Sequence, residues 1–520
     1  MRFLKYKRGT FLNILMMCLI VFGCDPDLLD EDVNPNTLTP STFWQKESDA
    51  VNAIIGAYSP YTDIWYYSRG EIFLSDYRDD VTNPFAVSDR SNPGRFAGTS
   101  DQNFIEWVWR AQWFCVTRAN EIIANVPGID MDPDLRNTIV GEAHFIRAHN
   151  YFNLLNNWLN IPLITEPITA IDLEAVVQAD PGEVRELMIS DLSKAKSMLP
   201  DTWDSDNTGR ATAGAATALL GKVYLYGEQW GLAAGEFQEV MSSGMYSLVD
   251  NYADNFSTFS ENNSESIFEI QFIADNDRRW GGDAPGRGRT NSFTPDIAPQ
   301  GFTGQDGMRI NEWVLDLFLD ERTVNDQIDP RAFNTIFWRT DETTTYRGDT
   351  LGATIYEGQT YQEVYEATEN RIFGKKYLGL DEGVTTALFQ RSPNNLRLIR
   401  YADVLLMYAE AQLMDNGGNA TQAAVDAVNE VRARVDMPPF GLEMTMDDIR
   451  DERVKELTLE RTRYFDLLRW DMVKERIVDT PGIKSESGGT GAYRPGREYL
   501  DLPQNDLNLN SNFRHNPGYE

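Results

Sequence analysis

Residues 445–470 combine apolar and charged side chains on a single predicted helical face. Thr445 followed by Asp448 forms a capping box, which marks the start of a helix. The positions that recur at helical spacing are Ile449, Arg453, Leu457, Glu460, Tyr464 and Leu468. A carboxylate on a core-facing line must be paired, so we expect Glu460 to pair with Arg463, three residues on. The stretch is therefore interpreted as one helix whose partly buried ion pairs fix its register, with a catalytic carboxylate pair as the alternative.

The same stretch resembles the C-terminal signature of the SusD/RagB family, which are nutrient-binding lipoproteins of the bacterial outer-membrane surface. The residues that carry the resemblance are Glu452, Arg453, Glu456, Glu460, Arg463, Asp466, Arg469 and Trp470. Further matches are the aromatic-rich helix at 142–158 with the Ile161-Pro-Leu turn after it, the Asp329–Trp338 segment, and the tail motifs at 500–507 and 516–519. These matches follow one another in the family's order.

The first 23 residues are predicted to be a lipoprotein signal peptide. Four basic residues precede an apolar run from Phe11 to Phe22, which is too short for an ordinary membrane span. Val21-Phe-Gly-Cys24 reads as a lipobox, so Cys24 is expected to be acylated and to begin an acidic tether over residues 24–40. The alternative is an ordinary secretory signal that is cleaved elsewhere.

Cysteine content and charge agree with an exported, acidic chain. Once Cys18 is removed and Cys24 is acylated, only Cys115 remains, so no internal disulfide can form. Cys115 lies in an apolar helical run and is expected to be buried. Removing the four basic residues of the signal lowers the formal charge from −33 to −37, which argues against nucleic acid as a partner.

The periodicity predicts a mainly α-helical domain over residues 41–520. The expected helices begin near Ser48 (with a kink at Pro60), at Asp101, and over 142–158, 181–199, 211–240, 398–413 and 421–435. The last two form one hairpin of tetratricopeptide type and 211–240 forms another, in which small residues face large ones. Residues 250–395 are expected to be a loop-rich insertion with a few short strands, such as 266–273. The fold class is thus a globular helical body with scattered helix pairs and a loop-rich insertion.

No catalytic, cofactor or metal motif is recognised in the sequence. His144 and His149 are five residues apart and do not share a helix face. The segment Asp204–Gly209 has calcium-loop character but lacks the distal Glu. We therefore predict no cofactor, no metal and no enzymatic activity.

Candidate ligand-binding residues come from what the family resemblance implies, namely aromatic platforms and polar groups from the early loops and the insertion. At the matching positions stand Arg78, Trp107, Trp280 and Trp338. A sugar ring stacks its C–H face on such aromatic planes while polar side chains bond its hydroxyls. The basic, glycine-rich segment 278–289 adds Arg287, whose planar guanidinium suits carboxylate or sulfate. One interpretation of these arginines is that they bind a ligand with acidic groups. The alternative is that they pair with the acidic surface of the protein itself.

The resemblance implies a lipid-anchored protein at the surface of the outer membrane that binds an oligomeric nutrient. A glycan is the favoured class of ligand, and a peptide is the alternative. Its implied partner is a SusC-like TonB-dependent transporter, and its only contact with the membrane is the lipid anchor. Two alternatives remain open: a surface glycoside hydrolase, which needs only two carboxylates, and a helical-repeat scaffold that binds protein.

Cys24→Ala should abolish acylation, because the thiol is the only group to which the diacylglyceryl chain is attached. Metabolic labelling with a fatty acid should mark the wild-type protein and leave the variant unlabelled. Equal labelling of both would reject the lipobox interpretation.

Overall fold

The computed structural model describes residues 43–85, 88–168, 173–273, 290–299, 307–352, 355–356, 359–360, 371–378 and 391–519. Its helices are α3 (Glu47–Tyr58), α4 (Asn103–Asn125), α5 (Pro133–Trp158), α6 (Pro181–Met198), α7 (Ala213–Tyr226), α8 (Trp230–Ser242), α9 (Thr294–Ile297), α10 (Glu312–Asp320), α11 (Pro330–Thr335), α13 (Tyr401–Asp415), α14 (Gln422–Arg434), α15 (Met446–Leu457), α16 (Arg463–Arg469) and α17 (Gln504–Leu509). The mainly α-helical class is confirmed. Among the described residues, no helix is both long and apolar enough to cross a lipid bilayer.

The strands that the structure describes are short, and they form two-stranded sheets. They are β1 (Thr82–Pro84), β2 (Ser266–Ile270), β3 (Met308–Ile310), β4 (Ile336–Phe337), β5 (Thr344–Tyr346), β6 (Asp349–Leu351), β7 (Ile355–Tyr356), β8 (Gln359–Thr360), β9 (Phe373–Gly374) and β10 (Leu396–Arg400). The pairs β1–β3, β2–β10, β4–β9, β5–β6 and β7–β8 are all antiparallel. Most of them fall within 250–400, as expected for the insertion.

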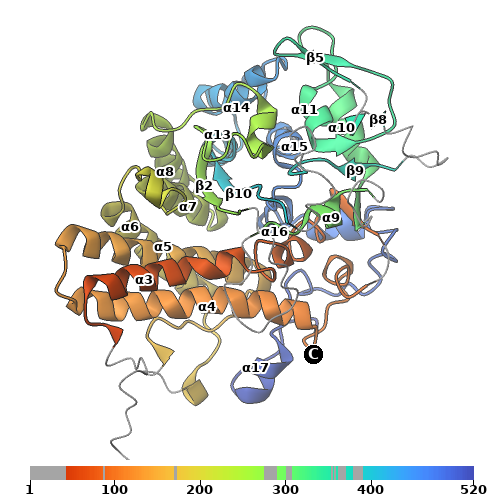
Figure 1. Ribbon diagram of the computed structural model, residues 1–520. Helices are drawn as coiled ribbons and strands as arrows, with labels where there is room; N and C mark the ends of the chain where they lie inside the picture. The colour runs from red at the N-terminus through yellow and green to blue at the C-terminus, as the bar shows by residue number, and fades with distance from the viewer. Residues whose placement is uncertain are drawn as a thin grey trace, which may run out of the picture.

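The long helices form one continuous array in which each helix packs against the next. The order is α3, α4, α5, α6, α7, α8, α13 and α14, and Figure 1 shows it running from the orange helices through the olive ones to blue α14. The two predicted hairpins, α7–α8 and α13–α14, are far apart in sequence but adjacent in space, because α13 packs directly on α8. The intervening residues are thus an excursion from the array.

The starts of these helices follow from capping residues in the sequence. Asp132 accepts hydrogen bonds from the backbone N–H groups of Asp134 and Leu135 at the start of α5, and Pro133 occupies the first helical position. Side chains also cap α6, α7, α14 and α15, through Asp180, Thr212, Thr421 and Thr445. The capping box of Thr445 and Asp448 is confirmed. The first helix ends at Tyr58, and Ser59–Thr62, with Pro60, forms a 3-10 turn.

Helix α5 lies at the centre of the array and is buried around nearly its whole circumference after Ile139. Most of its buried polar side chains are therefore paired inside the protein, the indole nitrogen of Trp158 being an exception. His144 and Arg147 share Asp191, at 2.7 Å each. The two ring nitrogens of His149 lie 2.9 and 3.3 Å from the hydroxyls of Tyr61 and Tyr67. The side chains of both histidines are thus hydrogen-bonded parts of the buried core. Cys115 is also buried, as predicted.

The predicted single helix over 445–470 is wrong. The structure ends α15 at Leu457 and begins α16 at Arg463, and between them Leu459 and Arg461 have left-handed backbone angles, with φ of 67° and 62°. The break turns Glu460 away from Arg463, so the predicted pair does not form. Glu460 instead binds Lys376 at 2.8 Å and Arg400 at 2.7 Å. Asp466 and Arg469, which have the same spacing as Glu460 and Arg463, do pair, at 2.8 Å.

A buried network of arginines and carboxylates joins α11, α14, α15, β2 and β10. Glu456 of α15 binds Arg331, Arg400 and Arg434. Glu452, one turn earlier, binds Arg331 at 2.6 Å and Arg432 at 2.8 Å. Arg400 and Arg434 also share Glu265, the residue just before β2. A charge in this interior is tolerated only because its partners surround it.

Glu460→Gln should lower the free energy of unfolding by about 3 kcal/mol or more, because the buried ammonium of Lys376 loses its carboxylate partner and Arg400 loses one of its three. Chemical denaturation measures this loss. The control is Glu239→Gln on α8, which removes an exposed ion pair with Lys196 and should cost ~1 kcal/mol or less. Equal losses in the two variants would contradict the buried network.

His149 should make the protein less stable in mild acid. Burial, reinforced by Lys222, lowers the pKa of His149 from 6.5 to about 3. A folded-state pKa below the unfolded one means that this contribution to stability is complete above pH 6.5 and is lost as the pH falls toward 3. At pH 5 the loss is about 2 kcal/mol.

Unfolding free energies measured from pH 7.5 to pH 4 test this. The His149→Gln curve should fall less steeply than the wild-type curve, whereas His515→Gln, which alters a half-exposed side chain, should retain the His149 contribution. Parallel curves for wild type and His149→Gln would refute it.

Candidate ligand-binding site

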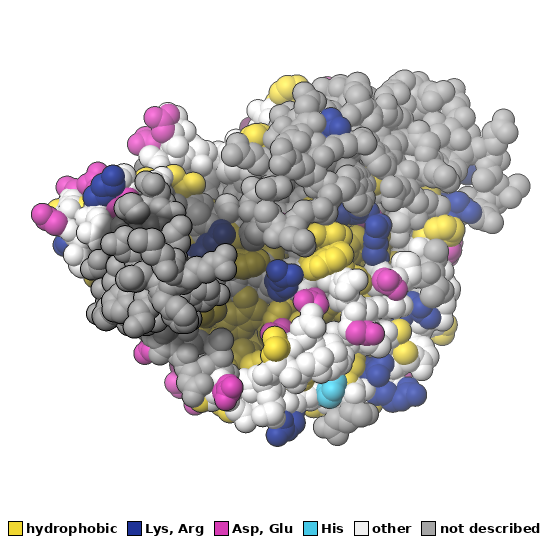
Figure 2. Space-filling model, turned by 60° about the horizontal axis from the view of Figure 1, so that its bottom comes forward, with side chains coloured by type: hydrophobic (Ala, Val, Ile, Leu, Met, Phe, Trp, Pro, Cys, Tyr) yellow, Lys and Arg dark blue, Asp and Glu magenta, His cyan; other side chains and the backbone are white. Residues whose placement is uncertain are grey.

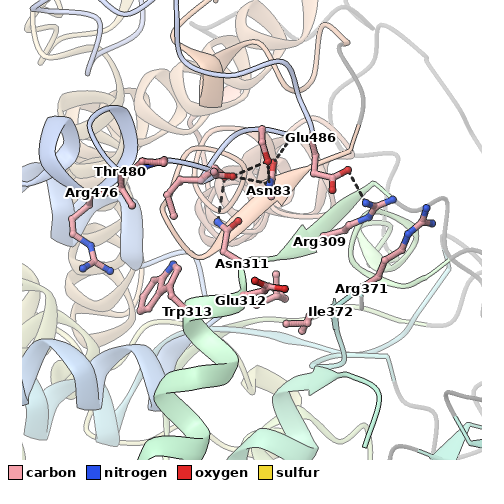
Figure 3. Close-up of a pocket in the computed structure, with 15 residues that line it drawn as sticks. Asn83, Arg309, Asn311, Glu312, Trp313, Arg371, Ile372, Arg476, Thr480 and Glu486 are labelled. Carbon is pink, nitrogen blue, oxygen red and sulfur yellow. Dashed lines mark hydrogen bonds and ion pairs between the residues drawn. The ribbon is translucent and has the colours of Figure 1, made fainter. Parts of the chain in front are cut away.

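A pocket of about 620 Å³ lies between β3, the start of α10 and the segment 480–486. This volume is within the range of ~300–1,000 Å³ that is usual for small-ligand sites. Figure 3 shows its polar and aromatic lining, in which the labelled residues are Asn83, Arg309, Asn311, Glu312, Trp313, Arg371, Ile372, Arg476, Thr480 and Glu486. The site thus draws on four stretches that are far apart in the sequence: Asn83, residues 309–313, residues 371–372 and residues 476–486.

The pocket wall is built by short pairings that bring these stretches together. Strand β1 pairs with β3, with Asn83 opposite Arg309. Asn311 follows β3, and its side-chain amide donates to the carbonyls of Asp80, Thr82 and Ile483. One side chain therefore holds the early loop and the C-terminal segment on the same wall. Asn311 also precedes the first turn of α10 as its N-terminal cap residue.

Trp313 supplies the aromatic surface of the pocket. Its indole N–H donates to the Asp80 carbonyl at 2.9 Å, so the ring is fixed and its polar atom is satisfied. The Arg476 guanidinium lies 4.7 Å from the ring centroid. In Figure 3 this pair occupies one side of the pocket while Arg309 and Arg371 occupy the other, with Glu312 between them.

The arginines of the pocket carry their own counter-charges. Arg309 binds Glu486 at 2.6 Å and lies 4.6 Å from the centroid of Phe85, which is 42% exposed beside it. Arg476 binds Asp80 at 2.9 Å. Arg309 and Arg476 thus each have a carboxylate partner within the site.

Behind the pocket lies a buried charged layer that fixes the early loop. Asp80 accepts from Arg463 and Arg476; burial alone would raise the pKa of its carboxyl, but these two arginines hold that pKa below its usual value. Lys484 donates to the carbonyls of Tyr77 and Thr82. Burial lowers the pKa of Lys484 to about 8, against the opposing effect of Asp79. The loop at 75–84 is therefore an interior element.

The predicted ligand residues that the structure describes, Arg78, Trp107 and Trp338, do not come together. Arg78 has no exposed surface: it donates to Asn157 and Tyr464 and stacks 4.0 Å over the Tyr464 ring. Trp338 is 4% exposed and packs on Phe333. Both are interior residues here, because the segments that carry them fold inward. Trp107 is partly buried, with its ring centroid 4.1 Å from that of Trp65, and it does not line the pocket.

Trp280 and Arg287 lie outside the described residues, as does the whole basic segment 278–289. The sequence interpretation missed Arg309, Asn311 and Trp313. The available signal was the alternation of Met308-Arg309-Ile310 followed by a polar helix start with an early tryptophan. The signature residues support the site from behind: Arg463 binds Asp80, and the others bind one another or the buried network.

The face of the protein that Figure 2 shows mixes side chains of all kinds. Figure 2, seen from below the view of Figure 1, shows hydrophobic side chains gathered near the middle of the face, with basic and acidic ones among and around them. Among the described residues, no group of His, Cys, Asp and Glu could hold a metal ion.

Two family models match the chain. One, described as SusD family, matches residues 264–519, and the other, described as starch-binding associating with outer membrane, matches residues 29–225. SusD-like protein P25 of Formosa agariphila is 26% identical over 96% of this chain and 97% of its own length. The starch-binding protein SusD of Bacteroides thetaiotaomicron is 23% identical over 80% and 78%.

Solved structures have the same fold. A SusD superfamily protein from Bacteroides vulgatus superposes with a TM-score of 0.77 at 23% identity, over 92% of this chain and all of that one. A laminarin-binding SusD-like protein superposes with a TM-score of 0.74 at 26% identity, over 91% of this chain and all of that one.

Proposed function

This chain belongs to the SusD family, and from that membership we propose that it is a non-catalytic glycan-binding lipoprotein whose ligand occupies the pocket between β3, α10 and residues 480–486. The observation that supports the proposal is the pocket lining: one fixed tryptophan surrounded by hydrogen-bonding side chains. A sugar ring needs that combination, because it has an apolar C–H face and a rim of hydroxyls. The relatives named for starch and laminarin support a glycan as the ligand class.

The glycan proposed for this pocket is neutral. Arg309 and Arg476 are paired with Glu486 and Asp80, so each of these guanidinium groups already has a carboxylate partner beside it. An acidic glycan, the alternative that Arg287 favours in the sequence, would depend on residues outside the described part of the chain. Salt separates the two, because screening weakens contacts with a charged ligand.

The proposed setting is the outer surface of the outer membrane, with Cys24 as the lipid anchor. The proposed partner is a SusC-like TonB-dependent transporter that receives the glycan. Within this proposal the protein captures the ligand and releases it unchanged.

Trp313→Ala and Glu312→Ala should each weaken glycan binding by about tenfold or more, which corresponds to ~1.4 kcal/mol. Calorimetry with maltohexaose and laminarihexaose, and affinity gels containing starch or laminarin, measure the effect. Glu312 is exposed, so its variant keeps the fold intact. Trp107→Ala is the matched comparison, because that tryptophan lies outside the pocket.

Loss of binding in Trp107→Ala with normal binding in both pocket variants would place the site in the early region instead. The same mixtures are examined for released sugars. Shorter products would favour a hydrolase, for which Glu312 and Glu486 are the carboxylates of this pocket. Failure to bind any glycan would leave the protein-binding scaffold as the better reading.

A further inference from the structure

A separate cavity of about 320 Å³ lies on the helical side of the protein. It is formed by the loop between α6 and α7, the residues that follow α8, and strand β2. None of its lining residues lines the pocket at β3 and α10. In Figure 1, α7, α8 and β2 lie to the left, whereas α10 and β9 lie to the right.

The walls of this cavity are aromatic and held in place. Trp203 is partly buried, and its indole N–H donates to the Ala211 carbonyl at 2.9 Å, so its polar atom is satisfied. Tyr246 packs against α7 at Gly214, where an added Cβ would lie 2.3 Å from the tyrosine hydroxyl oxygen. Met245, 45% exposed, extends the apolar surface. The cavity is thus preorganised, which reduces the entropy cost of binding.

The loop that carries Trp203 is also fixed to its surroundings. Gly209 has a φ of 90°, and a Cβ there would lie 2.3 Å from the Gln271 side chain. The neighbouring Arg210 reaches inward and binds the buried carboxylate of Glu142. Its guanidinium lies 4.2 Å from the centroid of the Trp203 ring. The segment at 204–209, whose sequence has calcium-loop character, therefore forms part of the wall of this cavity.

The charges of the cavity are balanced. Arg210 is neutralised by Glu142, yet it uses only some of its five N–H donors: Nε and one Nη bond Glu142, and the other Nη bonds Asn207. Glu269, on the cavity floor, is engaged by Arg397 at 3.3 Å and by Ser266 at 2.7 Å. At the rim stands Asp201, an exposed carboxylate. An anionic ligand would find no positive charge in this lining that lacks a counter-charge, and the carboxylate of Asp201 would repel it.

We propose that this cavity is a second binding site, for one or two rings of a neutral saccharide. The aromatic and thioether surfaces of Trp203, Tyr246 and Met245 would contact the C–H faces, while Arg210 donates to hydroxyls and Asp201 accepts from them. Two sites on one chain would let a long glycan bind at both, so that the second contact becomes intramolecular and raises the overall affinity. The inference does not depend on the pocket at β3 and α10 being the principal site.

The test uses the full chain carrying Glu312→Ala and Trp313→Ala, in which the first pocket is weakened. Saturation-transfer NMR and calorimetry with maltohexaose and laminarihexaose should still detect binding in this background. Adding Trp203→Ala or Tyr246→Ala should reduce that residual affinity by about tenfold, and Asp201→Ala, an exposed change that leaves the fold intact, should reduce it to a smaller extent. Adding Phe259→Ala, which removes a 79% exposed ring outside both cavities, should change nothing.

Three results would overturn the inference: no residual binding of either hexamer, residual binding that survives Trp203→Ala, Tyr246→Ala and Asp201→Ala, or tighter, salt-sensitive binding of a galacturonate oligomer to the same background. If instead Glu312→Ala and Trp313→Ala leave wild-type affinity unchanged, while Trp203→Ala removes it, the first pocket fails and this site stands alone.

Discussion

The arrangement of the C-terminal half depends on the ion pairs made by one buried carboxylate, that of Glu456. Three arginines, Arg331, Arg400 and Arg434, converge on it from α11, β10 and α14. An interior charge with a missing partner costs several kcal/mol, so a structure with only some of these elements in place gains little. The network therefore favours a state in which the insertion and the helical array are docked together. It contributes to the uniqueness of the fold more than to its net stability.

The helical array was predictable because its signals are local. Periodicity, capping residues such as Asp132 and Thr421, and small-to-large packing all act within a few residues of one another. The break between α15 and α16 was not predictable on those grounds. It depends on partners far away in sequence: Lys376 and Arg400 for Glu460, and Asp80 for Arg463. Helical spacing predicted that Glu460 pairs with Arg463, its near neighbour in sequence, whereas its partners in the structure come from distant segments.

The same limit applies to the binding residues. Tryptophans in polar, loop-like sequence seemed the best platforms, yet Trp338 faces the interior. Trp313 sits at the start of a helix, where sequence alone suggests core packing, and it becomes part of a pocket only because residues 480–486 close over β3. A pocket assembled from four distant stretches leaves no compact motif. Its members can be identified only after the chain is folded.

The β2–β10 pair has a consequence for how such a chain diversifies. Ile270 lies opposite Leu396, so more than a hundred residues leave and re-enter the helical array at adjacent points. Because the ends are already joined, doubling the length of the excursion would add only ~0.6 kcal/mol of closure entropy. Insertions and deletions are therefore cheap for the scaffold where they spare the buried partners that the excursion supplies, Arg331 and Lys376. Selection can alter the rest of the excursion over a wide range of lengths while the helices keep their packing, which separates the evolution of recognition from the evolution of stability.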